Sequence, residues 1–273
     1  MTINCKGKLI DLSTPKIMGI LNITPDSFFD GGKYDNDKAI LLQTEKMLNE
    51  GATFIDVGAY SSRPGAKDIS VDEELVRIVP TIELLVAKFP EIIISVDTFR
   101  SKVAEATIDA GAAIINDISG GTLDAAMFLT VAKLKASYIL MHMQGNPQNM
   151  QQDPTYVNVV REIISFFAEQ LEALRTLHVN DVIIDVGFGF GKTLAHNYEI
   201  LQDLALFKSL EAPVLAGISR KSMLYKALGV TSSEALNATT VANTIALLNG
   251  ANILRVHDVK EAVEAVKIVK QIQ

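Results

Sequence analysis

Tryptophan is absent from the chain, and aromatic residues of all kinds make up only 6% of it. Hydrophobic residues nevertheless reach 48%, so a large core has to be built mainly from Ile, Leu, Val and Ala. Aliphatic side chains of this kind are typical of parallel strands that are covered by helices. The length of 273 residues suits one barrel, and we expect residues 1–273 to form a single domain.

Cysteine is almost absent too, because Cys5 is the only one and no disulfide can form within the chain. This favours a reducing compartment. The segment Met1–Lys8 lacks the apolar stretch of a secretory signal, and no apolar run approaches the ~20 residues of a membrane-spanning helix. We therefore expect a cytoplasmic protein that does not insert into a membrane.

Basic runs are also missing. The chain carries 25 Lys and Arg against 32 Asp and Glu, a net charge of -7, and both signs are spread along it. A nucleic-acid-binding protein would need a basic face, so we expect no nucleic-acid partner. If the substrate is anionic, the positive charge that binds it must be supplied locally, inside a cleft.

Short apolar runs alternate with longer amphipathic segments along the whole chain. The short runs predict eight strands: Lys16–Leu21, Phe54–Val57, Ile92–Val96, Ile114–Asn116, Tyr138–Met141, Val182–Asp185, Val214–Gly217 and Ile253–Val256. The longer segments predict helices: Asp37–Glu50, Val71–Phe89, Ser101–Ala110, Leu123–Leu134, Thr155–Leu177, His196–Phe207, Lys221–Leu228, Ser233–Asn249 and Val259–Lys270. Strict alternation predicts a parallel sheet, and eight units favour a closed (β/α)8 TIM barrel. A doubly wound open sheet is the alternative, since periodicity alone does not show closure.

The predicted strands end at polar residues that a core strand would not favour: Asn22, Asp56, Asp97, Asn116, His142, Asp185, Ser219 and Arg255. In a barrel these ends form one rim, which carries the active site. One such residue alone would be interpreted as a helix cap or a satisfied polar group, and that remains the better interpretation of His142. The whole set predicts a site at the rim. The role of Asp56 is left open between binding and orienting its neighbours.

Arg255 and His257 stand two residues apart at the end of the last predicted strand, so both side chains share one face. The planar fork of an arginine suits phosphate, and barrels often bind phosphate with the loops after their last two strands. An ion pair with a neighbouring acid is the less favoured alternative for Arg255. For Arg220, in the preceding loop Gly217–Ser222, an ion pair at a helix start or a solvated surface charge is at least as good an interpretation as a ligand role.

Other rim residues indicate a metal and a heterocycle. Asn22 is an oxygen ligand that, beside an anion site, suits Mg²⁺, which keeps few protein ligands and several waters. Asp97, Asn116 and Asp185 combine acceptors with an amide, as a flat heterocycle with several N–H donors would require. The alternative is an internal hydrogen-bond network that holds the barrel together.

The segment Asp185–Lys192, DVGFGFGK, contains three glycines that let the backbone approach a ligand closely. Its spacing is not that of a P-loop, and a dinucleotide fingerprint would not follow a sixth strand. No nucleophile elbow or cysteine nucleophile is recognisable. These residues are suited to binding and charge stabilisation rather than to covalent catalysis.

Eight segments, which together span nearly the full chain, resemble the dihydropteroate synthase family and occur in the family's order. They are MGILNITPDSFFDGG (Met18–Gly32), DVGAYSSRPG (Asp56–Gly65), SVDT (Ser95–Thr98), IND (Ile115–Asp117), MHMQG (Met141–Gly145), DVGFGFGK (Asp185–Lys192), GISRKS (Gly217–Ser222) and RVHDV (Arg255–Val259). The first segment, SRKS and RVHDV are the most specific. Two positions depart from the pattern: Val186 stands where the family usually has Pro, and Ser62 where it usually has Thr.

The resemblance implies a homodimeric transferase of folate biosynthesis that joins 6-hydroxymethyl-7,8-dihydropterin diphosphate to p-aminobenzoate. It implies that the pterin is held by Asp97, Asn116, Asp185 and Lys221, with Arg255 along the ring. The diphosphate is held by Asn22, Arg255 and His257, with Asn22 on Mg²⁺; these three and Lys221 are the expected catalytic residues. The p-aminobenzoate pocket is shaped by Ser62, Arg63, Pro64, Phe190, Lys221 and Ser222, and covered by Phe28.

Three other functions compete with this one. A pterin-dependent methyltransferase would share the barrel and the pterin site but would need no diphosphate site. A non-catalytic pterin-binding protein would bind pterin without turnover. A sugar-phosphate enzyme on a barrel would explain Arg255 but not the set of Asp97, Asn116 and Asp185.

Overall fold

The computed structural model describes residues 1–23, 33–61 and 68–272. Eight parallel strands close a barrel in the order β10-β3-β4-β5-β6-β7-β8-β9. Their bounds are β3 (Lys16–Asn22), β4 (Phe54–Gly58), β5 (Ile94–Asp97), β6 (Ile114–Asp117), β7 (Ser137–Met141), β8 (Val182–Asp185), β9 (Val214–Ala216) and β10 (Ile253–Val256). The last strand pairs with the first, with Arg255 opposite Met18. The predicted (β/α)8 barrel is therefore confirmed, and the open sheet is excluded.

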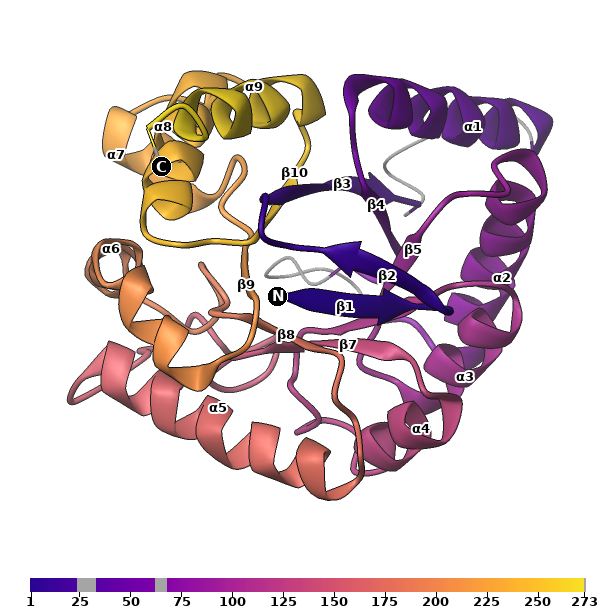
Figure 1. The fold of residues 1–273 in the computed structure, drawn as a ribbon, viewed down its shortest axis with the longest axis horizontal. Helices are drawn as coiled ribbons and strands as arrows, with labels where there is room; N and C mark the ends of the chain where they lie inside the picture. The colour runs from indigo at the N-terminus through magenta and orange to yellow at the C-terminus, as the bar shows by residue number, and fades with distance from the viewer. Residues whose placement is uncertain (24–32, 62–67, 273) are drawn as a thin grey trace.

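Helices surround the barrel on the outside (Figure 1). They are α1 (Lys33–Glu50), α2 (Val71–Lys88), α3 (Ser101–Asp109), α4 (Met127–Leu134), α5 (Val159–Thr176), α6 (Leu194–Gln202), α7 (Ser222–Leu228), α8 (Leu236–Leu248) and α9 (Val259–Val269). The helix predicted over Thr155–Leu177 begins later, because the side chain of Asn158 caps its start by accepting from the N–H of Arg161 at 2.8 Å. The helix predicted over His196–Phe207 is divided into α6 and the 3₁₀ helix η2 (Leu204–Leu210).

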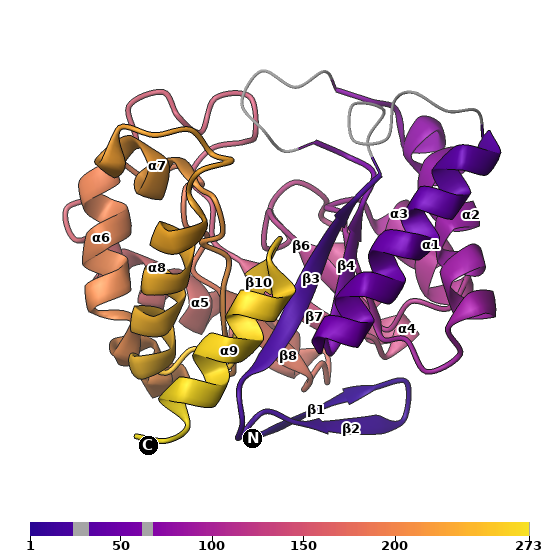
Figure 2. The same ribbon diagram turned by 90° about the horizontal axis from the view of Figure 1, so that it is seen from above.

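An N-terminal hairpin, which the strand pattern did not predict, precedes the barrel. Strands β1 (Thr2–Cys5) and β2 (Lys8–Asp11) pair antiparallel. The turn residues Lys6 and Gly7 have φ of 52° and 84°, as a two-residue hairpin turn requires. Figure 2 shows the hairpin lying across the end of the barrel where the strands begin.

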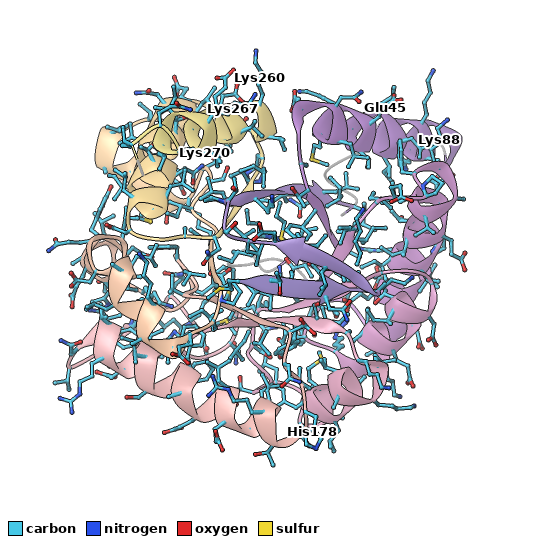
Figure 3. All side chains as sticks on the ribbon, in the orientation of Figure 1. Glu45, Lys88, His178, Lys260, Lys267 and Lys270 are labelled. Carbon is cyan, nitrogen blue, oxygen red and sulfur yellow. The ribbon has the colours of Figure 1, made fainter. Side chains whose placement is uncertain are left out.

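The hairpin fills the bottom of the barrel with apolar side chains. Ile3 and Leu12 are almost fully buried and form one cluster with residues near the strand starts, among them Met18, Phe54 and Ile253. A larger apolar cluster lies between the strands and the helices. Figure 3 shows side chains filling both spaces, whereas labelled residues such as Lys260 and Lys267 point outward. The rim at the carboxyl ends of the strands is therefore the end available for a ligand.

No helix in the described part of the chain combines the length and apolar character that crossing a bilayer demands.

Candidate active site

The strand register places several predicted site residues in one row of the rim. Asn22 on β3 lies opposite Gly58 on β4, Gly58 lies opposite Asp97 on β5, and Asp97 lies opposite Asn116 on β6. Gly58 lies directly between its neighbours, since a Cβ there would contact the Cβ of Asp97 at 3.4 Å and Oδ1 of Asn22 at 3.7 Å. Three side chains from separate motifs thus converge because their strands are neighbours.

Arg255 crosses the mouth of the barrel to this row. Its Nε donates to Oδ2 of Asp56 at 2.6 Å, and its Nη2 donates to Oδ2 of Asp97 at 2.8 Å. The prediction that disfavoured an ion pair for Arg255 was wrong. The two acids are 199 and 158 residues away in the chain, and only barrel closure brings them together.

Asp56 is fully buried and orients two neighbours at once. Besides Arg255, its Oδ2 accepts a hydrogen bond from Nδ2 of Asn116 at 3.1 Å. Sequence reasoning left the role of Asp56 open; its place inside an apolar run was the available signal. Among the described residues, Oδ1 of Asn116 has no hydrogen-bond partner although the residue is only 3% exposed. A buried amide oxygen of this kind is suited to accept from a ligand N–H.

Asp185 and Lys221 form the other side of the mouth. The Asp185 carboxylate accepts from the N–H of Gly187 at 2.8 Å. Lys221 is the N-cap residue of α7; its ammonium donates to the carbonyl of Phe188 and lies 4.6 Å from the ring centre of Phe190. The structure therefore brings Lys221 and Phe190 together, and their assignment to a p-aminobenzoate pocket stays a prediction. Ser222 follows as the first residue of α7.

Burial shifts the titration of these groups toward neutral pH. It raises the pKa of Asp97 to about 7 against the opposing charge of Arg255, with a further rise from the charge of Asp56. It also raises the pKa of Asp185, whereas the nearby Lys221 ammonium lowers it. Burial lowers the pKa of Lys221 to about 8, against the attraction of Asp185. Acidic and basic side chains with shifted pKa values that lie together in one mouth of a barrel are typical of an active site.

Lys192, at the end of the glycine loop, is buried and bonded to the end of β7. Its Nζ donates to Nδ1 of His142 at 3.0 Å, to the carbonyl of His142 at 3.2 Å and to the carbonyl of Phe190 at 3.0 Å. Burial lowers the pKa of His142 to about 2 and that of Lys192 well below its usual value. The interpretation of His142 as a satisfied rim histidine is confirmed. Sequence reasoning missed Lys192, and its only signal was a lysine closing a glycine-rich apolar segment.

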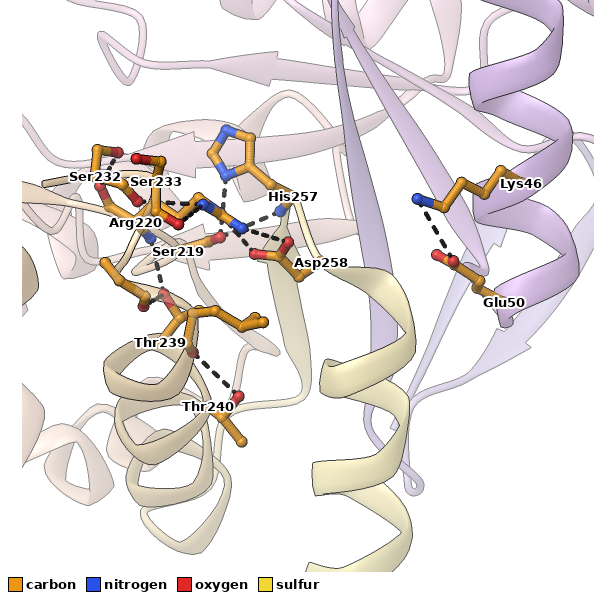
Figure 4. Close-up of polar contacts among 12 residues, drawn as sticks. Lys46, Glu50, Ser219, Arg220, Ser232, Ser233, Thr239, Thr240, His257 and Asp258 are labelled. Atoms are coloured by element: carbon orange, nitrogen blue, oxygen red, sulfur yellow. Dashed lines mark hydrogen bonds and ion pairs between the residues drawn. The ribbon is translucent and has the colours of Figure 1, made fainter.

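The loops after β9 and β10 are joined by two contacts, shown in Figure 4. The Ser219 hydroxyl lies 3.0 Å from Nδ1 of His257 and accepts from the backbone N–H of His257 at 3.2 Å. Beside it, Nε and Nη2 of Arg220 each donate to a carboxylate oxygen of Asp258 at 2.8 Å. The ion-pair interpretation of Arg220 is confirmed.

Four predicted residues of the p-aminobenzoate pocket, Phe28, Ser62, Arg63 and Pro64, lie outside the described residues.

Residues 18–257, from the strand that begins the barrel to His257, match the family described as pterin binding enzyme. The dihydropteroate synthase of Escherichia coli (strain K12) is 44% identical over 276 residues, covering 99% of this chain and 96% of the relative. The chain belongs to the dihydropteroate synthase family. It is accordingly a transferase of folate synthesis.

Solved structures of family members share the fold over the full chain. The Yersinia pestis dihydropteroate synthase in complex with a sulfonamide drug superposes with a TM-score of 0.93 and 43% identity, covering 100% of this chain and 99% of that one. The Xanthomonas albilineans dihydropteroate synthase with 4-aminobenzoic acid gives a TM-score of 0.92 and 37% identity, covering 100% and 98%.

Proposed function

We propose that the rim of this barrel joins 6-hydroxymethyl-7,8-dihydropterin diphosphate to p-aminobenzoate, giving 7,8-dihydropteroate and diphosphate. The observation that carries the assignment of residues is the cluster around Arg255, where acids, an amide and two cations from separate strands and the start of α7 meet. Such a cluster suits a substrate with a polar heterocycle at one end and a strongly anionic group at the other.

The pterin would bind against Asp97, Asn116, Asp185 and Lys221. The free Oδ1 of Asn116 and the carboxylate of Asp185 provide acceptors for pterin N–H groups. The Lys221 ammonium provides a donor for a ring acceptor. Asp185→Asn keeps the shape but removes the charge, so we expect pterin affinity to fall by roughly 10-fold or more. Calorimetry with an unreactive pterin would measure this affinity. The control is the same substitution at Asp109, on the exposed end of α3.

The diphosphate would bind to Arg255 on β10 and to His257, the residue that follows this strand. Among the described residues, Nη1 of Arg255 makes no hydrogen bond, so one donor of the fork is available to phosphate oxygen while the others bind Asp56 and Asp97. His257 is exposed at the rim. Negative charge grows on the diphosphate as its bond to the pterin methylene breaks, and these donors stabilise it.

Magnesium fits this site as a metal shared with the substrate. Asn22 is half-buried next to Gly58, and the described residues contain no group of three His, Cys, Asp or Glu that could hold a metal alone. Mg²⁺ commonly takes one or two protein oxygens and completes its shell with waters and substrate phosphates. Asn22 would hold it, and the bound metal would supply positive charge to the leaving diphosphate.

The second substrate would enter between the α7 start and the glycine loop. Its amine nitrogen forms the new bond to the pterin methylene and then loses a proton to solvent. Phe190 offers an apolar wall, and Lys221 and Ser222 offer polar groups next to it. The resemblance also assigns Phe28, Ser62, Arg63 and Pro64 to this pocket. Holding the two substrates in contact is the main catalytic contribution of such a pocket.

We further propose a cytoplasmic homodimer of one domain over residues 1–273. Val241, Ile245 and Leu248 recur on one face of α8 and are 53%, 38% and 47% exposed. A second copy would cover this stripe. Light scattering of the unaltered protein should give the mass of two chains, and light scattering of Val241→Asp should give the mass of one chain. A single-chain mass for the unaltered protein would exclude the dimer. Lys133→Asp, on the exposed surface of α4, is the control.

Turnover tests the function directly. Purified protein with Mg²⁺ and both substrates should form diphosphate and dihydropteroate in equal amounts, and formation should require the amine and stop when the metal is chelated. Pterin binding without either product would favour the methyltransferase or the non-catalytic binding protein. Absence of pterin binding would contradict the assignment altogether.

A further inference from the structure

We infer that Ser219 is a positioning residue that selects the tautomer of His257, so that Nε2 of the neutral imidazole carries a proton and can donate to the leaving diphosphate. The inference rests on the diphosphate-binding role proposed for His257. It concerns a residue that acts through its two contacts with His257.

The hydrogen-bond geometry of the hydroxyl decides the tautomer. Ser219 Oγ accepts from the backbone N–H of His257 at 3.2 Å and lies 3.0 Å from Nδ1 of the same residue. A serine hydroxyl has one hydrogen to donate. Ser219 is only 4% exposed, and within residues 1–23, 33–61 and 68–272 its hydrogen has no acceptor other than Nδ1.

If Nδ1 carried the proton, Oγ would accept twice and the buried hydroxyl hydrogen would lack a described acceptor. If Nδ1 is the acceptor, both Ser219 groups and the His257 N–H are satisfied together. Buried donors are rarely left unpaired, so the second arrangement is favoured. In a neutral imidazole an unprotonated Nδ1 requires a protonated Nε2.

The neighbouring ion pair holds this geometry in place. Arg220 follows Ser219 and Asp258 follows His257, and their two bonds of 2.8 Å tie the same two loops (Figure 4). Arg220 also donates to the carbonyls of Ser232 and Ser233, at 3.2 and 2.7 Å, and its N–H bonds to Thr239 at 3.0 Å. Oγ of Ser219 therefore faces Nδ1 on a backbone that is fixed on both sides.

For the reaction, the consequence is that Nε2 of His257 can donate a hydrogen bond whether the imidazole ring is neutral or charged. An imidazolium carries a proton on Nε2 in any case, and Ser219 keeps one there when the ring is neutral. On protonation Nδ1–H donates to Oγ, and the Ser219 hydroxyl hydrogen turns away from the ring and loses the acceptor that the neutral imidazole gave it. Nε2–H is thus retained on both sides of the imidazole titration.

Nitrogen NMR of the whole protein with ¹⁵N-labelled histidine tests the tautomer directly. The chain has 4 histidines, and His257→Gln identifies the resonances of His257. At a pH where its imidazole is neutral, we expect the shift of a protonated Nε2 and an unprotonated Nδ1. The reverse pattern in the unaltered protein overturns the inference, whatever the Ser219 variants do.

Kinetics test the consequence. Ser219→Ala should populate the second tautomer and raise the KM for the pterin diphosphate by about 2- to 10-fold, with a smaller effect on the KM for p-aminobenzoate. Ser219→Thr, which keeps the hydroxyl, should restore both the spectrum and the KM. Ser232→Ala removes a hydroxyl that bonds to the carbonyl of Arg220, not to the imidazole, and is the matched control.

The two proposals fail in distinguishable ways. If magnesium diphosphate leaves the His257 resonances unchanged and His257→Gln turns over normally, the diphosphate role of His257 is wrong while the tautomer result stands. If the diphosphate shifts the Nε2 resonance of His257 but Ser219→Ala alters neither the tautomer nor the KM for the pterin diphosphate, Ser219 has no positioning role.

Discussion

Arg255 and Asp97 meet across the mouth of the barrel, with Nη2 of the arginine 2.8 Å from Oδ2 of the aspartate although 158 residues separate them. Under the proposed assignment, one of these residues binds the leaving diphosphate and the other the pterin. The ion pair therefore joins the two ends of one substrate site. A change in either residue should affect both ends of the substrate.

Arg255→Ala should lower kcat/KM by at least about 100-fold, because a donor aimed at developing charge contributes on the order of 10²–10³ in rate. Arg255→Lys keeps the charge but loses the planar fork that reaches Asp56 and Asp97. Its kcat/KM should therefore lie between that of the unaltered protein and that of Arg255→Ala. Steady-state assays with both substrates measure this. Arg161→Ala, on the exposed start of α5, is the control. Unchanged turnover in Arg255→Ala would show that the diphosphate assignment is wrong.

Asp97 should set an acid limb in the pH profile. Its pKa is raised to about 7, so kcat/KM should fall as the pH drops through that value and the carboxylate loses its charge. Unfolding does not account for this fall: a raised folded pKa means that the contribution of Asp97 to stability is lost as pH rises through about 7, not as it drops. Asp97→Asn should be slow and lack this limb. If the acid limb of the Asp97→Asn variant lies at the same pH as in the unaltered protein, the limb belongs to another titrating group.

Lys221 should set the alkaline limb. Burial lowers its pKa to about 8, so loss of the ammonium above that pH should weaken pterin binding and reduce kcat/KM. In Lys221→Arg the side chain stays charged, and the limb should move beyond the range of the assay even if the rate is lower. Lys226→Arg, near the end of α7, provides the comparison with the same substitution outside the mouth. An alkaline limb that stays near 8 in Lys221→Arg would contradict this role.

Gly187→Ala should strongly destabilise the protein. Gly187 has φ of +67°, and a Cβ at this position would overlap the carbonyl oxygen of His142. Gly7→Ala is a matched control because its φ is +84° but nothing lies within 4 Å. We expect urea unfolding to show a loss of about 1 kcal/mol for Gly7→Ala, from backbone strain alone, and a loss of several kcal/mol for Gly187→Ala. Equal losses would mean that the glycine loop moves freely away from β7.

The eight strands of the barrel were predictable because each is a short apolar run followed by a longer amphipathic one. The hairpin of β1 and β2 was not, since its strands, TINC and KLID, mix exposed polar residues with buried ones and do not form an apolar run. Helix bounds shifted where a side chain such as Asn158 intervened. The rim residues were predictable because a polar side chain at the end of an apolar run is locally visible.

Pairings among rim residues were not visible in the same way. The ion pair of Arg255 with Asp56 and Asp97 was disfavoured from the sequence, and the burial of Lys192 against His142 was missed. Both depend on which strands become neighbours or face each other across the barrel. The bond between Ser219 and His257 depends likewise on the pairing of β9 with β10.

The sequence by itself therefore determined the fold class, the rim as the site and the chemical types of the groups there, because periodicity and composition are local properties of the chain. Only the tertiary structure decided which acid binds Arg255, which lysine is buried, and which nitrogen of His257 faces Ser219. Closure of the barrel sets the distances between residues far apart in sequence. Hydrogen bonds and pKa values depend on those distances and on burial, and neither is encoded in any one segment.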